Sequence, residues 1–259
     1  RSGSLDESGL ELLRYDGSNW VTVPGSAVDD NADELSANIT TFSTFGAFGQ
    51  SPASFDVTID NTNSPVVEGD ALLVNGTVEN TGGETGTQDV NLTEFGGNEV
   101  DTETFTLSGG ARDKFNFTWS TNVGDAGTGD MTVASENDTD TSPVEVLQEA
   151  SFDVTIDSTN SPVVEGETLI VNGTVENTGE EDGTSQEVTL TDFDGNVVDS
   201  EVFQLDGGEQ DTFGFSWNTN VGDNETDNVT VSSDNETDID SVNVLRKSSF
   251  DVRITGTNS

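Results

Sequence analysis

Nine asparagines have the clearest chemistry in this sequence, because each is followed two positions later by threonine without an intervening proline. This Asn-x-Thr pattern is the acceptor for N-linked glycosylation of exported proteins. Asn75, Asn91 and Asn116 stand between apolar neighbours, so strand alternation turns them outward whether or not glycans are attached. The candidate sites are Asn38, Asn75, Asn91, Asn116, Asn137, Asn172, Asn224, Asn228 and Asn235.

Carboxylates with metal-ligand spacing occur at Asp192, Asp194 and Asn196, which resemble a fragment of a calcium loop. The full ligand spacing with a distal glutamate does not follow, so a hairpin turn is the simpler interpretation. The acidic turns 136–140 and 234–238 can hold hydrated calcium or other cations loosely. We therefore expect no cofactor and no specific metal site.

Catalytic chemistry finds little support, since the sequence contains no histidine and no cysteine. The usual general base and the thiol nucleophile are absent, and so are histidine-based zinc sites. A carboxylate pair, as in glycosidases, is possible in principle, but among 51 acidic residues such a pair carries no information. The sequence predicts a protein that is not an enzyme.

The charge is strongly one-sided, with 51 acidic against 7 basic residues and a formal net charge of -44. Nucleic acid and anionic membranes are therefore poor partners. A disordered acidic tail is one alternative, but here the acids alternate with apolar residues such as Leu72, Val74 and Val78. The composition resembles that of haloarchaeal proteins, which work in molar salt, where the Debye length is about 3 Å.

The chain does not open with the pattern of a signal peptide, and it has no run of about 18 apolar residues. We expect no direct membrane contact in this segment. If the protein is exported to the cell surface, the targeting and anchoring segments lie outside these 259 residues.

A long internal repeat organises the chain. SFDVTIDNTNSPVVEGD begins at Ser54 and SFDVTIDSTNSPVVEGE at Ser151, and later equivalents such as Trp119 and Trp217 are 98 residues apart. A period this long indicates whole domains rather than solenoid units. We expect a β-rich module ending at 50, domains at 51–150 and 151–247, and the first strand of a third copy at 248–259.

Each copy reads as short alternating runs between turns, near 54–60, 70–79, 87–95, 99–107, 112–119, 129–135 and 142–147 in the first. Seven strands in about 97 residues predict an all-β fold of tandem immunoglobulin-like β-sandwiches in a linear array. The expected core residues are Phe55, Val57, Ile59, Leu72, Val74, Val78, Val90, Leu92, Phe105, Leu107, Phe115, Phe117, Trp119, Met131, Val133, Val144 and Val146.

The segments VEGDALLVNGTVENTGGETGTQDVNL and FNFTWSTNVGD resemble the CARDB family of prokaryotic cell-adhesion-related β-sandwich domains. The resemblance covers both copies and implies a non-catalytic, extracellular, adhesive role. The N-T-G turn within it is shared with many bacterial sandwich domains. In the first 50 residues, TTFSTFGAFG resembles the PGF-pre-PGF segment of haloarchaeal exported proteins.

Three functions follow as hypotheses. The first is a stalk or spacer of a haloarchaeal cell-surface glycoprotein, with other surface proteins or further copies of itself as partners. The second is a subunit of an extracellular filament or sheath, in which the alternating Phe250, Val252 and Ile254 add as a strand to a neighbouring subunit. The third is a carbohydrate-binding module.

Overall fold

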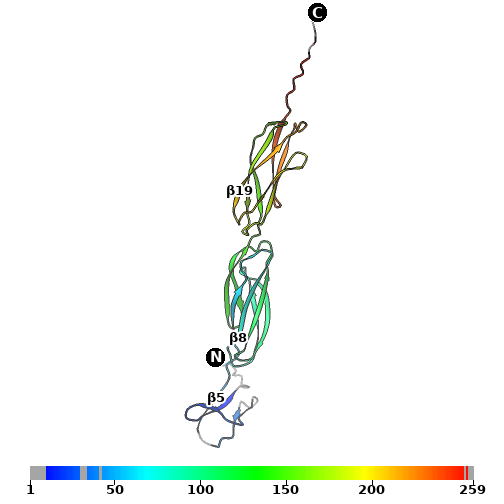
Figure 1. Ribbon diagram of the computed structural model, residues 1–259. Coiled ribbons are helices and arrows are strands. Elements are labelled where there is room, and N and C mark those ends of the chain that lie inside the picture. The colour runs from blue at the N-terminus through cyan, green and yellow to red at the C-terminus, as the bar shows by residue number, and fades with distance from the viewer. Residues whose placement is uncertain (1–9, 30–33, 41–42, 254, 256–259) are drawn as a thin grey trace. The chain divides into compact units, whose positions relative to one another are not determined.

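The computed structural model describes residues 10–29, 34–40, 43–253 and 255. The chain divides into two compact units, Arg1–Val146 and Leu147–Ser259. The described residues form strands and turns and contain no helix, so the all-β prediction is confirmed (Figure 1).

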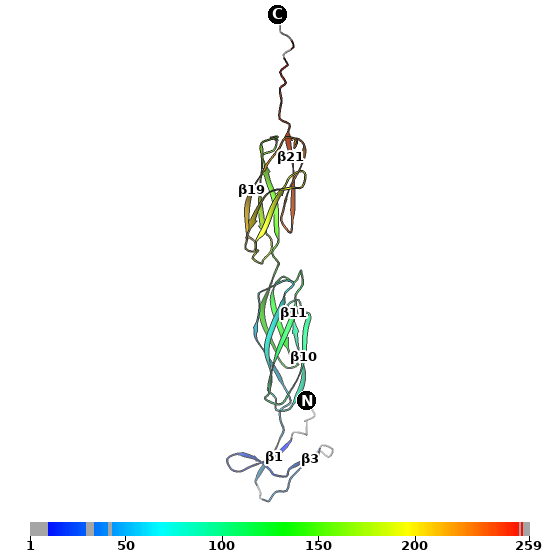
Figure 2. The same ribbon diagram turned by 45° about the vertical axis from the view of Figure 1, so that its right-hand side comes forward.

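The N-terminal module, residues 10–50, contains a three-stranded sheet with the order β2-β1-β5 and a separate hairpin of β3 and β4 (Figures 1 and 2). Its strands are β1 (Glu11–Tyr15), β2 (Trp20–Thr22), β3 (Ala27–Asp29), β4 (Glu34–Ser36) and β5 (Thr44–Phe48). Tyr15, Trp20 and Phe48 are each about 40% exposed and form a cluster, with ring centroids 5.6 Å and 5.0 Å apart. Trp20 therefore lies at the surface of this module.

Sandwich 1 consists of a three-stranded sheet, order β11-β8-β6, and a five-stranded sheet, order β10-β9-β12-β13-β7 (Figure 2). Its strands are β6 (Phe55–Thr62), β7 (Val66–Val67), β8 (Ala71–Asn80), β9 (Gly86–Thr93), β10 (Glu99–Leu107), β11 (Arg112–Ser120), β12 (Gly127–Ala134) and β13 (Thr139–Leu147). The three-stranded sheet is antiparallel throughout.

Sandwich 2 repeats this topology, with sheets β14-β16-β19 and β15-β21-β20-β17-β18. Its strands are β14 (Phe152–Thr159), β15 (Val163–Val164), β16 (Thr168–Asn177), β17 (Gln186–Thr191), β18 (Val197–Phe203), β19 (Gln210–Asn218), β20 (Thr226–Ser232) and β21 (Thr237–Leu245). The short β15 pairs in parallel with β21. Each sandwich therefore has seven long strands and one two-residue strand.

The two-residue strands β7 and β15 were missed by the sequence analysis. Two valines are too short a run for an alternation to be recognised, and their pairing depends on the distant strands β13 and β21. The last long strand of sandwich 1 also begins earlier than predicted, at Thr139 rather than 142. The pairing partner, β12, determines this boundary, because Ala134 is opposite Thr139.

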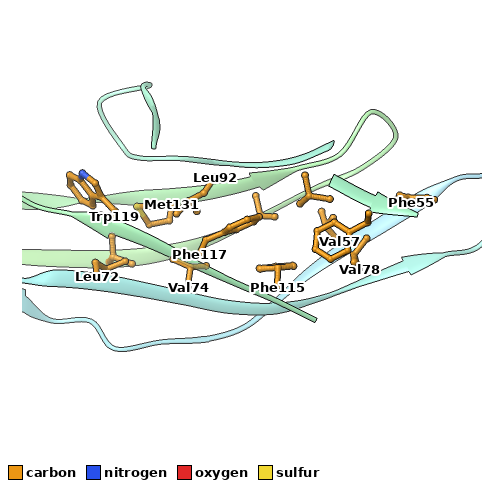
Figure 3. Packing of buried hydrophobic residues seen from close by; sticks show 14 of the residues in the cluster. Phe55, Val57, Leu72, Val74, Val78, Leu92, Phe115, Phe117, Trp119 and Met131 are labelled. Atoms are coloured by element: carbon orange, nitrogen blue, oxygen red, sulfur yellow. The ribbon is translucent and has the colours of Figure 1, made fainter. Parts of the chain in front are cut away.

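The core of sandwich 1 lies between its two sheets and contains the residues predicted from alternation (Figure 3). Phe55, Phe115 and Met131 have no exposed surface, and Trp119 is 6% exposed. Ile59 is the exception, because it is only partly buried against the cluster. Burial of a side chain of this size stabilises a fold by about 1.5–3 kcal/mol, so these positions dominate the folding of each sandwich.

Candidate functional site: connection anchors and closed sheet edges

Asn177, the last residue of β16, is a fully buried polar residue that holds the N-terminal end of sandwich 2. Its Oδ1 accepts hydrogen bonds from the backbone N–H groups of Ser151 and Gly179, both at 3.1 Å. Its Nδ2 donates to the carbonyl oxygens of Glu181 at 2.9 Å and Leu205 at 3.1 Å. All four hydrogen-bonding positions are used, so this side chain ties the start of the domain to two of its turns.

The N-T-G turn of the sequence is therefore a docking point for the connection rather than a simple turn. An added Cβ at Gly179 would lie 2.2 Å from the carbonyl oxygen of Glu149 and 2.7 Å from Cα of Ala150. Only glycine permits so close an approach of two backbones. Asn80 and Gly82 repeat the arrangement in sandwich 1, where Asn80 is also fully buried. In that copy, Asn80 bonds to Ser54, Gly82, Glu84 and Leu107.

Gln148 also belongs to the docked segment. Its N–H donates to a carboxylate oxygen of Glu180 at 3.1 Å, and its carbonyl accepts from the N–H groups of Glu180 and Glu181 at 3.1 and 3.0 Å. Because β13 ends at Leu147, the chain passes directly from a strand of sandwich 1 to a residue bonded within sandwich 2.

The C-terminal end of sandwich 2 is held by Glu165, which is 6% exposed. Its carboxylate accepts from the N–H of Gly222 at 3.0 Å and from the N–H of Lys247 at 2.9 Å. These hydrogen bonds lower the pKa of Glu165 below its usual value of 4.5. β21 ends at Leu245, and the ionised carboxylate of Glu165 therefore holds the backbone two residues further along, at Lys247.

Side chains of the opposite sheet close the outer edge of β6, which is an end strand of its sheet. The acceptors come from the turn before β13 and from β13 itself. The N–H of Phe55 donates to Oδ1 of Asn137 at 3.0 Å, that of Val57 to Asp138 at 3.0 Å, and that of Ile59 to Asp140 at 2.7 Å. An open edge strand invites pairing with another chain, so these acceptors protect sandwich 1 from strand addition at β6.

Other sheet edges carry similar closures, which repeat in both sandwiches. Asp101 on β10 accepts from the N–H of Thr118 on β11 at 2.9 Å, which joins the two sheets at that side. Asp199 accepts from Ser216 in the same way at 2.8 Å. At the β13 side, the hydroxyl of Ser64 accepts from the N–H of Glu145 at 2.8 Å, as Ser161 does from Asn243.

The predicted metal fragment at Asp192, Asp194 and Asn196 forms the turn between β17 and β18. Oδ1 of Asp192 accepts from the N–H of Asp194 at 3.1 Å and from that of Asn196 at 2.8 Å. In the part of the chain that the structure describes, no group of three or more acidic residues is arranged to hold a metal ion. These three residues thus come together as a turn whose carboxylate is occupied by backbone donors.

Glu94 occupies the equivalent turn of sandwich 1 and is 7% exposed. Burial raises the pKa of this carboxyl, but hydrogen bonds from the N–H groups of Gly96 and Asn98 and from the Asn98 side chain outweigh it. The net pKa lies below the usual value of 4.5. Beside this turn, Phe95 meets Trp119 edge-on at 5.2 Å, as Phe193 meets Trp217 at 4.8 Å. The two tryptophans are core residues, as the sequence predicted.

The acidic turns 136–140 and 234–238 were interpreted as loose cation sites. The structure shows that the Asn137, Asp138 and Asp140 side chains accept backbone N–H groups of β6. Sequence reasoning missed this role, because donor and acceptor are more than 80 residues apart. The only signal in the sequence was the repetition of an Asn and an Asp at the same positions in both copies.

The nine sequons are spread over both units and do not form one site. Seven of their asparagines are exposed, namely Asn38, Asn116, Asn137, Asn172, Asn224, Asn228 and Asn235, while Asn75 and Asn91 are half-buried. In the terminal segment, Phe250 and Val252 are 92% and 85% exposed. Ile254, the third predicted residue of that strand, lies outside the described residues.

Among the described residues, no helix is long and apolar enough to cross a membrane.

Comparison with known proteins finds a family that matches part of the chain and distantly similar structures. No curated protein matches the chain. A crystal structure of red sea bream transglutaminase matches with 10% identity over 77% of this chain and 32% of that chain, so the match spans about a third of that structure. The TM-score of 0.30 is too low to support an argument. Residues 149–244 match the model of the CARDB family, whose members are cell-adhesion-related, non-catalytic immunoglobulin-like domains of secreted or cell-surface proteins. Over residues 149–244, sandwich 2 of this chain is therefore similar to CARDB domains.

Proposed function

We propose that this chain is a segment of a stalk or spacer in a cell-surface glycoprotein of a halophilic archaeon. The CARDB match to sandwich 2 and the internal repeat, which extends the same architecture to sandwich 1, support a tandem adhesive array. The net charge of -44 supports a high-salt environment, and the sequons support export. We propose further copies or other surface proteins as partners.

The observation that carries this proposal is the docked connection. Leu147 ends β13, and the next residue, Gln148, is already hydrogen-bonded in sandwich 2. A connection without free glycine or serine residues restricts the hinge motion that is otherwise the default between domains. A spacer needs this property, because a freely jointed chain would collapse rather than hold its cargo at a distance.

Small-angle X-ray scattering of the full chain in molar salt tests the spacer. The matched variant carries a Gly-Ser insertion of about six residues between Leu147 and Gln148. We expect a narrow distribution of interdomain distances for the native connection and a broad one for the variant. If the interdomain distances of the unmodified chain are as broadly distributed as those of the insertion variant, the spacer proposal fails.

The halophilic part of the proposal has its own test. Lowering the salt from molar to about 0.1 M lengthens the Debye length from about 3 to about 10 Å, so repulsion among the carboxylates increases. We expect the thermal unfolding temperature of both sandwiches to fall steeply over this range. A cooperative unfolding transition at the same temperature in both salts would contradict a halophilic origin.

A filament subunit is the second candidate, and the exposed Phe250 and Val252 favour it. Residues 250–252 repeat the Phe-Asp-Val of β6 and β14, where the equivalent Phe55 and Phe152 are buried. A segment of this pattern can add to the sheet of a neighbouring subunit. Negative-stain electron microscopy in molar salt decides between the candidates. Filaments that disappear in Phe250→Asp would support assembly, and isolated particles for both proteins would support the spacer.

A further inference from the structure

Two of the sequon positions occur in both sandwiches. Asn75 corresponds to Asn172 in the middle of a strand, and Asn137 corresponds to Asn235 in the turn before the last strand. The first pair lies on the central strand of a three-stranded sheet, with neighbours hydrogen-bonded on both sides. A glycosyltransferase must surround the Asn-x-Thr segment, so modifying the strand pair in the folded chain would require opening the sheet.

The turn pair is accessible without such opening. Asn137 and Asn235 are exposed, and the N–H of each donates to the hydroxyl of the serine two positions earlier, at 3.1 and 3.2 Å. Both asparagines lie in the turn between two strands, and the threonine of each sequon, Thr139 or Thr237, is the first residue of the strand that follows. Sequons that are used for N-linked glycans belong on surface loops, which is where this pair lies.

The orientation of the amide is the more informative observation. Oδ1 of Asn137 accepts from the N–H of Phe55 at 3.0 Å and from Nε2 of Gln88 at 2.6 Å. Oδ1 of Asn235 accepts from the N–H of Phe152 at 3.0 Å. Since these partners are donors only, each amide must direct its oxygen inward and its Nδ2 away from the strand. Nδ2 is the atom that glycosylation modifies, so a glycan leaves the hydrogen bond to the edge strand intact.

The strand sequon of sandwich 1 has the opposite arrangement. Asn75 is half-buried, and its Nδ2 donates to Oδ1 of Asn61 at 3.0 Å. A glycan there would replace one of the two Nδ2 hydrogens beside this bond and would meet Asn116 on the next strand, which is directly paired with Asn75. By contrast, a surface hollow borders Asn235, with Gln186 and Asp182 also lining it.

We propose that Asn137 and Asn235, the turn sequons shared by both sandwiches, are N-glycosylated in the folded chain, which rests on the proposed extracellular function. The donor is a lipid-linked glycosyl phosphate. The bond from Nδ2 to the anomeric carbon forms, the bond from that carbon to the phosphate oxygen breaks, and the phosphate leaves with the electron pair while Nδ2 loses a proton. Each glycan then stands beside the edge of β6 or β14 and shields it further against strand addition.

The test is mass-spectrometric mapping of the full chain, exported by a halophilic archaeon that N-glycosylates its surface proteins. Glu-C peptides containing Asn137 and Asn235 should carry glycan. Thr139→Ala and Thr237→Ala should each remove the glycan from their own turn, while Thr139→Ser, which keeps the sequon, should retain it. Asn137→Asp keeps an acceptor for the Phe55 N–H but has no amide, so it should fold normally and carry no glycan.

Bare turns, or glycans on Asn75 and Asn172 with both turns unmodified, would overturn the proposal. The second pattern would mean that the sugar is attached before the sheets form. The location of the native protein is measured separately, by protease treatment of intact native cells. Resistance of the chain to that treatment would count against the extracellular function, while the glycan map of the exported chain would still decide the sites.

Discussion

Sandwich 1 and sandwich 2 have the same topology and equivalent core positions, with Met131 replaced by Val229, but differ in how their edges are closed. In sandwich 1, Asp138 accepts from the N–H of Val57. In sandwich 2, the equivalent Glu236 accepts no hydrogen bond from Val154 within the described residues, although the neighbouring Asp238 still bonds to Ile156 at 2.7 Å. Glutamate is one methylene longer than aspartate and does not fit the same short approach.

The charge on the outer face also differs. Arg112 and Lys114 are the only basic residues of sandwich 1, and the equivalent residues of sandwich 2 are Gln210 and Thr212. Arg112 pairs with Glu79 at 2.7 Å, with its side chain 66% exposed. The buried anchor, Asn80 or Asn177, is the same in both copies. The comparison shows that the anchors and core define this domain, whereas one edge bond and the exposed ion pair are replaceable.

The largest expected effect comes from the shared anchor. Asn177→Ala removes four hydrogen bonds, of which those to the Gly179 N–H and the Leu205 carbonyl are buried, so we expect a loss of about 3 kcal/mol of unfolding free energy in sandwich 2. Asn80→Ala should cost sandwich 1 about the same. Hydrogen exchange at increasing denaturant measures each sandwich separately. Asn172→Ala, on the same strand but exposed, is the control and should change stability by less than about 0.5 kcal/mol. Clearly unequal losses of unfolding free energy for Asn80→Ala and Asn177→Ala would contradict the conclusion that this anchor has the same role in both sandwiches.

The hydrogen bond of Asp138 to the edge of β6 should distinguish the two sandwiches in their loss of stability on mutation. Asp138→Ala removes a charge-assisted hydrogen bond and should cost sandwich 1 about 1–2 kcal/mol. Glu236→Ala should change sandwich 2 by less than about 0.5 kcal/mol, because no such bond is present. Asp140→Ala and Asp238→Ala serve as the matched pair, with equal losses expected. Equal losses at 138 and 236 in denaturant titrations would show that Glu236 closes the edge after all.

The anchor at the C-terminal end predicts a pH dependence. Since the pKa of Glu165 is lowered in the folded chain, the stability it contributes is complete above the usual pKa of 4.5 and is lost as the pH falls through the folded value. The difference in unfolding temperature between the native chain and Glu165→Gln should therefore be full at pH 7 and should shrink below about pH 4.5. Differential scanning calorimetry over this range is the measurement. A difference that grows on acidification would refute the role of the carboxylate.

Glu68 provides the comparison in sandwich 1. Within the described part of the chain, its carboxylate accepts one N–H, from Gly124 at 2.6 Å, whereas that of Glu165 accepts two. At pH 7, we expect Glu68→Gln to lower the unfolding temperature of its sandwich by less than Glu165→Gln does.

The smallest effect is expected at the exposed ion pair. Arg112→Gln converts sandwich 1 to the residue found in sandwich 2 and should cost less than about 0.5 kcal/mol, even less in molar salt. Chemical denaturation in low and high salt measures it. A cost above about 1 kcal/mol would mean that the basic pair on β11 is part of what stabilises sandwich 1.

Much of the fold could be predicted from the sequence, because strands with one buried face alternate with period two. Phe115, Phe117 and Trp119 form such a run, and all three are buried. Pairing partners could not be predicted in the same way. The two valines of β7 show no pattern of their own, and Ile59 lies next to a register shift in its pairing, so it is only partly buried.

The candidate site was less accessible to sequence reasoning. The N-T-G turn was recognised as a motif, but the four hydrogen bonds of Asn177 connect residues up to 28 positions apart. The turn residues Asn137 and Asn235 were recognised as sequons, without any indication that their oxygens face inward.

The sequence by itself therefore determined the strands, the core and the strong negative charge, since each depends on residue type and local alternation. The tertiary structure alone decided which acidic and amide side chains become acceptors for the sheet edges and the connections. The donors are N–H groups from strands about 80 residues away, such as that of Ile59 for Asp140, and only the packing of one sheet on the other brings the two together.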